Sequence, residues 1–295
     1  MAVKHHRLLS VSYTHMDNEE KIQKTEFWPV SFRVICVGKE MSAVFRTIIS
    51  FGFEGVSVQT TTMFPDPRPT DENKMVILLA NGYSQQLENI AKSFYQAGVL
   101  TLIISTHDME NLQGVCDAMT VSNWESMPLI VKSLIDPLIK QGIICFDVND
   151  LSMTLHNAQK FKIVSTLSRT NENRIDVLVK NLDGLLEGYN LSEKENITII
   201  LYHNKKVNPP LAMNELRPLS EFIGNFPEDV SVIWGLSFDN EMPTDEIRLD
   251  AIVAGKNLKL CHPHLPMRTG ASIGMKSSTR RNFEVGMFTD NTALE

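Results

Sequence analysis

From Phe32 onward, short apolar runs alternate with amphipathic stretches, and this pattern predicts strands separated by helices. The apolar runs of the first half are continuous, which is typical of strands covered by helices on both faces. The predicted strands are 32–37, 56–59, 75–80, 99–105 and 119–122. The predicted helices between them are 40–51, 83–96 and a short one at 109–116. This alternation predicts an α/β fold with a parallel, doubly wound, Rossmann-type sheet.

A longer helix, predicted over 124–141, follows these strands and has apolar residues at helical spacing. Pro128 falls in its first turns, where proline is tolerated, and we expect Pro137 to kink or fray its end. The second half has predicted helices at 147–158, 171–186 and 213–224, and predicted strands at 161–167, 197–202, 230–238 and 247–254. A turn-like segment at 240–245 joins the last two strands, which predicts a hairpin and an α+β arrangement.

These elements divide the chain into a polar N-terminal extension, two domains joined by a helix, and a tail. The predicted bounds are 1–30 for the extension, 31–123 for the Rossmann-type domain, 124–141 for the connecting helix, 142–258 for the α+β domain and 259–295 for the tail. The tail holds the run FEVGMF at 283–288, which can pair as a strand or dock as a peptide. A poorly ordered terminus is the alternative.

Composition limits the classes of function. The chain has 295 residues, of which 43% are hydrophobic and 21% charged, which is enough apolar material for a substantial core. Its net charge is −7 and its basic residues are scattered, which argues against a nucleic-acid partner. The four cysteines form no CxxC pair, and neither a signal peptide nor a membrane-spanning run is present. We therefore expect a cytoplasmic protein without a transmembrane segment.

Two turns occupy the places where a doubly wound sheet binds phosphate, at the carboxyl ends of strands. Each holds a single glycine, Gly38 after the first predicted strand and Gly82 after the third, and neither is a GxGxxG or a GxxxxGK[ST] loop. Glu40 would also repel a phosphate. No acidic residue closes the second strand, where a dinucleotide enzyme has its ribose contact. The sequence therefore predicts vestigial phosphate loops at Gly38 and Gly82.

Other candidate sites are weaker. Cys261, His262 and His264 could bind a metal, but no second cluster supplies the remaining ligands, so we expect no metal site. His107 and Asp108 follow the fourth predicted strand and could line a small-molecule crevice together with the threonines at 60–62. No nucleophile or oxyanion-binding loop accompanies them.

The order and spacing of several segments resemble those of the bacterial cell-division protein FtsZ and, more remotely, of tubulin, over about 33–255. GIICFDVND at 142–150 resembles the GxxNxDxxD loop of the family, with Cys145 in place of its asparagine. WG at 234–235, followed by DEIRL at 245–249, resembles the paired strands that close the second domain of FtsZ. Asn173 and Arg174, and SAVFR at 42–46, fit as well. The resemblance implies an FtsZ/tubulin-like fold.

The resemblance also implies which half of the family's GTPase site is kept. The family's GGGTGTG signature is missing at 81–86, and the segments 60–74 and 122–124 are contracted. In the family, GTP held by one subunit is hydrolysed with help from carboxylates of the next subunit, and Asp147 and Asp150 match those carboxylates, with Gly142 opening the loop. The same two residues also suit the N-cap and N3 positions of a helix, where carboxylates cap free N–H groups and complement the helix dipole.

These features predict a pseudo-GTPase without bound GTP or GDP. We expect it to act by association with itself or with a genuine FtsZ-type protein, capping or modulating a filament in a cytoskeletal or division-related role. The alternatives are nucleotide-independent self-assembly, a divergent GTP-binding homologue that forms polymers, and a small-molecule enzyme that uses the strand-end crevice.

Overall fold

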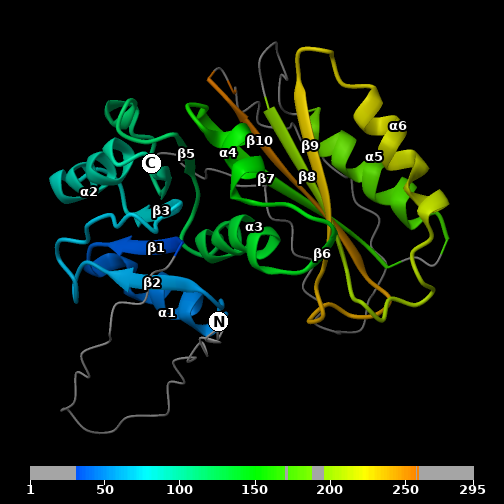
Figure 1. Cartoon of the computed structure of the whole chain (residues 1–295), viewed down its shortest axis with the longest axis horizontal. Coiled ribbons are helices and arrows are strands. Elements are labelled where there is room, and N and C mark those ends of the chain that lie inside the picture. Colours follow the sequence, from blue (N-terminus) through cyan, green and yellow to red (C-terminus); the bar gives the residue numbers. More distant parts are fainter. Residues whose placement is uncertain (1–30, 170–171, 188–195, 257, 259–295) are drawn as a thin grey trace, which may run out of the picture.

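The computed structural model describes residues 31–169, 172–187, 196–256 and 258 (Figure 1). It shows an α/β protein whose ten strands form one sheet in the order β2-β1-β3-β4-β5-β7-β10-β8-β9-β6. The extension at 1–30 lies outside the described residues. So does the tail at 259–295, with the possible metal cluster of Cys261, His262 and His264 and the run at 283–288.

The first half of the sheet is parallel and covered on both faces. Its strands are β1 (Phe32–Val37), β2 (Val56–Thr60), β3 (Met75–Ala80), β4 (Leu100–Ser105) and β5 (Ala118–Val121). Helix α1 (Ser42–Ser50) packs on one face through Val44 and Ile48. Helix α2 (Gln85–Gln96) packs on the other face through Ile90 and Phe94. The predicted Rossmann-type arrangement is therefore confirmed.

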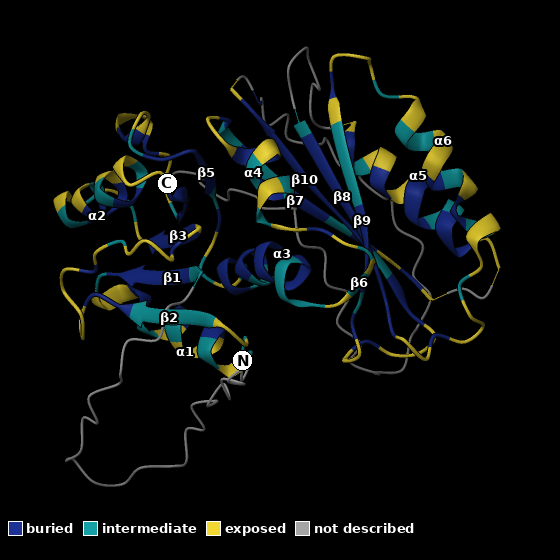
Figure 2. Ribbon diagram, viewed as in Figure 1, coloured by how far each residue is buried: buried dark blue, intermediate teal, exposed yellow. Residues whose placement is uncertain are grey.

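Helix α3 (Met127–Ile139) connects the two halves and is buried on most of its surface (Figure 2). It shares one apolar core with α1 and with strands of both halves. The helix is shorter than predicted because it begins after the turn at Asn123, whose side chain accepts the N–H of Ser126. Pro128 lies near its start and Pro137 in its last turn, and the helix ends two residues after Pro137.

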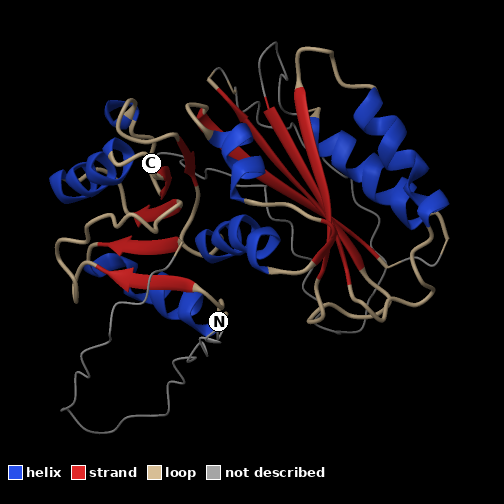
Figure 3. Cartoon of the chain, viewed as in Figure 1, coloured by secondary structure: helices blue, strands red, loops and turns tan. Residues whose placement is uncertain are grey.

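The second half of the sheet is mixed, with helices on both faces (Figure 3). Its strands are β6 (Gly142–Ile144), β7 (Gln159–Ser168), β8 (Asn196–His203), β9 (Ser231–Phe238) and β10 (Ile247–Gly255). Helices α5 (Arg174–Leu186) and α6 (Arg217–Gly224) cover one face, with a 3-10 turn at Met213–Leu216 before α6. Helix α4 (Val148–Leu155) shares the core of α3.

The predicted hairpin between the last two strands is wrong. Strand β8 lies between β9 and β10, pairing with β9 in parallel and with β10 in antiparallel orientation. Strand β10 is also paired with β7, so both of its edges are bonded. Eight of its nine residues are buried, which explains why it takes an interior place in the sheet and not an edge.

Two shorter elements also differ from the prediction. Only a 3-10 turn at Glu110–Leu112 forms where a helix over 109–116 was expected, because Gly114 takes a positive φ of 90° just after it. Strand β6 was not predicted, and it pairs antiparallel with β9 at the edge of the sheet. Among the described residues, no helix is both long and apolar enough to cross a membrane.

Candidate functional site

The turns after β1 and β3 lie side by side at the carboxyl edge of the parallel strands. The register pairs Val37 with Ala80, so Gly38 and Gly82 leave neighbouring strands at nearly the same level. Both glycines have positive φ, 92° and 95°, which a residue with a Cβ adopts only with strain. The glycines are therefore needed for the turns themselves, whether or not a ligand binds there.

The main-chain donors of both glycines are bonded within the chain. The N–H of Gly38 donates to Thr61 Oγ1 at 3.0 Å, and the N–H of Gly82 donates to Ser105 Oγ at 3.2 Å. Thr61 and Ser105 are themselves buried. A phosphate loop works because such N–H groups point at the ligand, and in these two turns a buried hydroxyl takes that position.

Two carboxylates lie at the starts of the helices that follow the turns. A Cβ built on Gly38 would lie 2.5 Å from Glu40 Oε2, so the glutamate side chain folds over this turn. Ser84 caps α2 by accepting the N–H of Leu87, and Glu88 lies in the first turn of that helix. The hydrogen bond to Glu88 raises the pKa of Tyr83, whose hydroxyl donates to it at 2.6 Å. Negative charge therefore occupies the positive end of α2.

The residues proposed for a small-molecule crevice are not brought together. His107 Nδ1 lies 2.8 Å from Thr106 Oγ1, at the end of β4. Asp108 pairs with Lys160 at 3.4 Å. The threonines at 60–62 close β2, and β1 and β3 lie between β2 and β4. Three strand spacings, about 14 Å, therefore separate His107 from these threonines.

The loop that holds Asp147 and Asp150 lies at the opposite edge of the parallel strands. Beside it, helix α4 borders a cleft of about 680 Å³. On the sheet side the cleft is lined by residues at the amino ends of the strands, namely Asn73, Lys74, Val99, Leu100 and Asp117. On the α4 side it is lined by Val148, Asn149, Ser152, His156 and Asn157. The acidic loop and the two glycine turns thus lie at opposite ends of the parallel strands.

Asp147 and Asp150 cap helix α4 reciprocally. Asp147 Oδ1 accepts the N–H groups of Asn149 at 2.7 Å and of Asp150 at 3.1 Å. Asp150 Oδ2 accepts the N–H of Asp147 at 2.9 Å. The predicted N-cap and N3 positions are confirmed, and the arrangement is a capping box. Asp147 remains exposed, so its carboxylate is accessible while it caps the helix.

Close backbone packing holds the acidic loop against the edge of the sheet. A Cβ on Gly142 would lie 2.8 Å from the carbonyl oxygen of Leu236, so β6 can approach β9 only with glycine there. A Cβ on Gly235 would lie 3.3 Å from the Cβ of Phe146, which is buried against it. Contacts at Gly142, where the loop starts, and at Phe146, in its middle, therefore hold the loop against β9.

Cys145 is the exposed thiol of the acidic loop. Cys36 and Cys116 are buried, and burial raises the pKa of each to about 12. These two thiols are therefore inert, whereas the thiol of Cys145 is open to reagents.

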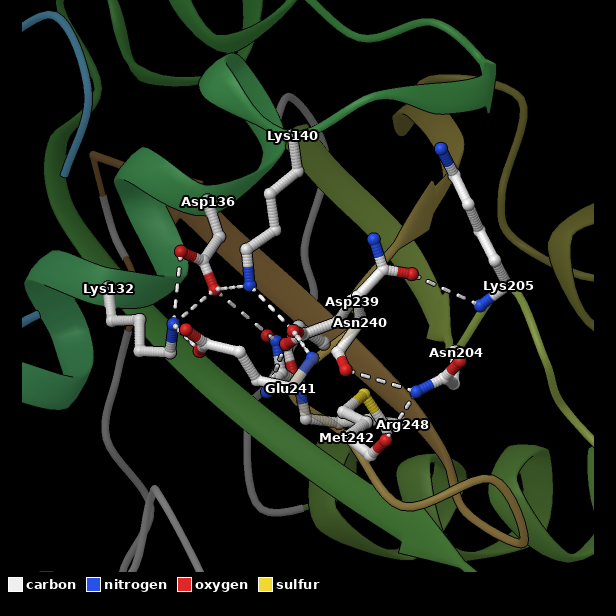
Figure 4. A network of polar contacts seen from close by, with 11 residues as sticks. Lys132, Asp136, Lys140, Asn204, Lys205, Asp239, Asn240, Glu241, Met242 and Arg248 are labelled. Atoms are coloured by element: carbon white, nitrogen blue, oxygen red, sulfur yellow. Dashed lines mark hydrogen bonds and ion pairs between the residues drawn. The ribbon is translucent and has the colours of Figure 1, made fainter. Parts of the chain in front are cut away.

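A buried ionic network joins α3 to the second half of the sheet (Figure 4). Asp136 Oδ2 lies 2.9 Å from both Lys132 Nζ and Lys140 Nζ, and its side chain is 1% exposed. Lys140 also lies 2.9 Å from Asp239 Oδ1. Arg248 extends the network along β10, with Nε 3.2 Å from Asp250 Oδ1. The network ties the connecting helix to β10 and to the segment after β9.

Burial and charge act against each other on these groups. Burial lowers the pKa of Lys140, but the carboxylates of Asp136 and Asp239 outweigh it and leave that pKa above its usual value. Burial likewise opposes the charge of Arg248, yet its acidic neighbours raise its pKa. Burial raises the pKa of Asp250 although Arg248 opposes the change. The network is therefore a set of desolvated charges that depend on one another.

Sequence analysis missed this network because no motif marks it. The available signals were an aspartate in the apolar stripe of α3 and another inside the apolar run of β10. A buried acid needs a partner, and Asp136 has the local lysines at i−4 and i+4, whereas the links to Asp239 and Arg248 join residues distant in sequence. Among the residues that the structure describes, no group of three or more His, Cys, Asp or Glu side chains could hold a metal ion.

No protein-family profile matches the sequence, and no curated protein sequence is similar to it. Solved structures do resemble the fold. An empty FtsZ dimer from M. jannaschii matches with a TM-score of 0.59 and 15% identity, covering 82% of this chain and 95% of that one. GDP-form TubZ protofilaments from Bacillus thuringiensis serovar israelensis match with a TM-score of 0.52 and 8% identity, covering 77% and 89%. The chain therefore has an FtsZ/tubulin-like fold.

Proposed function

We propose that this protein is a pseudo-GTPase that acts by protein–protein association in a cytoskeletal or division-related role. The observation that supports this proposal best is the internal bonding of the Gly38 and Gly82 N–H groups to Thr61 and Ser105. With these donors engaged and Glu40 and Glu88 at the same edge, the two turns do not fit the phosphates of a nucleotide.

Association is proposed because of what lies at the other end of the molecule. The acidic loop packs closely against β9 and keeps Asp147 and Cys145 exposed. The solved proteins with the same fold include an FtsZ dimer and TubZ protofilaments. We infer that the face carrying this loop docks on the nucleotide-bearing face of a genuine FtsZ-type protein. A chain that can offer this face but cannot hold a nucleotide itself would cap or modulate a filament and would not extend it.

Calorimetric titration with GTP and Mg²⁺ tests the loss of the nucleotide site. We expect no saturable heat, while a genuine FtsZ run in parallel binds. Saturable micromolar binding would contradict the pseudo-GTPase and favour a divergent GTP-binding homologue.

Co-sedimentation with polymerised FtsZ tests the docking. We expect this protein to pellet with the polymer or to change its GTP turnover. The matched control is the double variant Asp147→Asn, Asp150→Asn, because asparagine caps a helix about as well as aspartate but carries no carboxylate. Circular dichroism verifies that the variant folds, and we expect it to lose the effect on turnover. Absence of both pelleting and any effect of the wild-type chain would remove the proposal.

Light scattering without GTP and without FtsZ distinguishes the remaining alternative. A rise in scattering with the concentration of this protein alone would favour nucleotide-independent self-assembly. We expect no such rise.

A further inference from the structure

Strand β9 has an open edge over most of its length. On one side it pairs with β8 from Ser231 to Phe238. On the other side β6 reaches only Leu236 and Ser237. Within the described residues, no strand pairs with Ser231–Gly235 on that outer side, and 231–234 are more exposed than the rest of the strand (Figure 2). An open edge presents unpaired N–H and C=O groups that can accept a further strand.

An apolar groove lies beside this open edge. It has a volume of about 390 Å³ and is lined by Trp234 of β9 and by residues of α6 and the turn before it, Met213, Leu216, Arg217, Leu219, Ser220 and Ile223. Val232 and Trp234 face this side of the sheet, since both pack with the core under α5 and α6. A strand added here would place every second side chain over the groove.

We propose that residues 283–288 of this same chain, the run FEVGMF, add to the open edge of β9 as a parallel strand. The run alternates as such a strand requires, because Phe283, Val285 and Met287 fall on one face. These three apolar side chains enter the groove, and Glu284 and Gly286 fall on the other face.

The chain leaves the described structure next to this edge. Ala254 of β10 is level with Asn196 of β8, which is level with Ser231 of β9. The end of β10 is therefore two strand spacings, about 10 Å, from the start of the open edge. Leu258 is buried in the core under α5 and α6, on the side of the sheet where the groove lies. The length of the segment 259–282 allows a reach of up to about 80 Å, far more than this distance.

Strand geometry sets the direction of the added strand, and charge complementarity sets its register. A tail that turns back from β10 runs parallel to β9, because β9 and β10 point in opposite directions. Placing Val285 level with Val232 keeps residues 284–288 on the open stretch 231–235, clear of β6, and brings Met287 level with Trp234 and Arg281 level with Glu228. Asp229 and its neighbour Glu228 are exposed just before β9, and Arg280 and Arg281 come just before the run. Opposite charges thus meet where the added strand begins.

Hydrogen exchange measured on the full chain tests this proposal. The amides of 232–235 that face outward should exchange roughly tenfold faster in Val285→Pro than in the wild type, because proline removes a ladder donor and distorts the strand. Ile273→Pro is the matched control, with the same change in the same tail but outside the run, and it should exchange like the wild type. Equal exchange in all three proteins, or an equal rise in both variants, overturns the proposal.

Two further measurements decide the partner and the register. The exchange protection of the β9 amides should not change over a hundredfold range of protein concentration, and light scattering should show a monomer. If the protection grows with protein concentration and light scattering shows a dimer, the tail of a second copy occupies the edge. That result refutes the intrachain pairing. Glu228→Arg should weaken the protection, and adding Arg281→Glu should restore it. Failure of that restoration refutes the proposed register.

Discussion

Replacing Asp136 by asparagine should lower the free energy of unfolding far more than the same substitution at an exposed aspartate that forms an i,i+4 pair with a lysine. The side chain of Asp136 is 1% exposed and its Oδ2 lies 2.9 Å from two lysine Nζ atoms and 4.0 Å from Arg248. Asparagine keeps the shape of the side chain but removes its charge. The cations of Lys132, Lys140 and Arg248 then lose a carboxylate in a site that excludes water, and part of their desolvation is no longer compensated.

The size of the effect follows from these distances. A charge pair at about 3 Å with an effective dielectric constant of 20 is worth roughly 5 kcal/mol before desolvation is subtracted. The two lysines are 19% and 21% exposed, so they regain some hydration in the variant. Breaking a buried ion pair by removing one partner costs about 3 to 5 kcal/mol, and we expect about 3 kcal/mol here.

Urea unfolding followed by circular dichroism measures the loss. With a slope of about 3 kcal/mol per molar urea, the midpoint should fall by about 1 M. Asp176→Asn is the matched control, because Asp176 forms an exposed i,i+4 pair with Lys180 on α5 at 2.7 Å. That pair should contribute only about 0.3 to 0.5 kcal/mol. A fall in Asp136→Asn no larger than in Asp176→Asn would refute the reasoning that the network is desolvated and cooperative.

Three further outcomes are expected. Burial lowers the pKa of Lys162 from 10.5 to about 8 in the folded protein. Between pH 8 and 10.5 the amine is therefore protonated in the unfolded chain but largely neutral in the folded one. The free energy of unfolding should therefore rise with pH across that window by about 2 to 3 kcal/mol, and urea titrations of Lys162→Met should lack this rise. Gly142→Ala should cost about 1 to 3 kcal/mol in the same assay, because its Cβ would meet the Leu236 carbonyl at 2.8 Å. In a Cys261→Ser background, maleimide should label Cys145 and leave the two buried thiols unmodified, as mass spectrometry of the digest would verify.

Local pattern was enough to predict most of the helices and strands and the capping of α4. Continuous apolar runs identified the parallel strands, and the helical stripe identified α3, since burial on both faces or on one stripe leaves a periodic trace in the sequence. The reciprocal capping by Asp147 and Asp150 was also predictable, because a capping box needs only residues three positions apart. Single glycines at Gly38 and Gly82 were enough to show that phosphate loops of known type are missing.

Pairings between residues distant in sequence were decided only by the tertiary structure. Nothing local indicates that β10 enters between β7 and β8, because its apolar run fits a hairpin as well as an interior strand. The bond from the Gly38 N–H to Thr61, and the ion pairs of α3 with Asp239 and Arg248, exist only once the sheet brings these elements together. Periodicity records how deeply a residue is buried, whereas the partner of a buried charge or a free N–H is set by which strands are neighbours, and that follows from the packing of the whole chain.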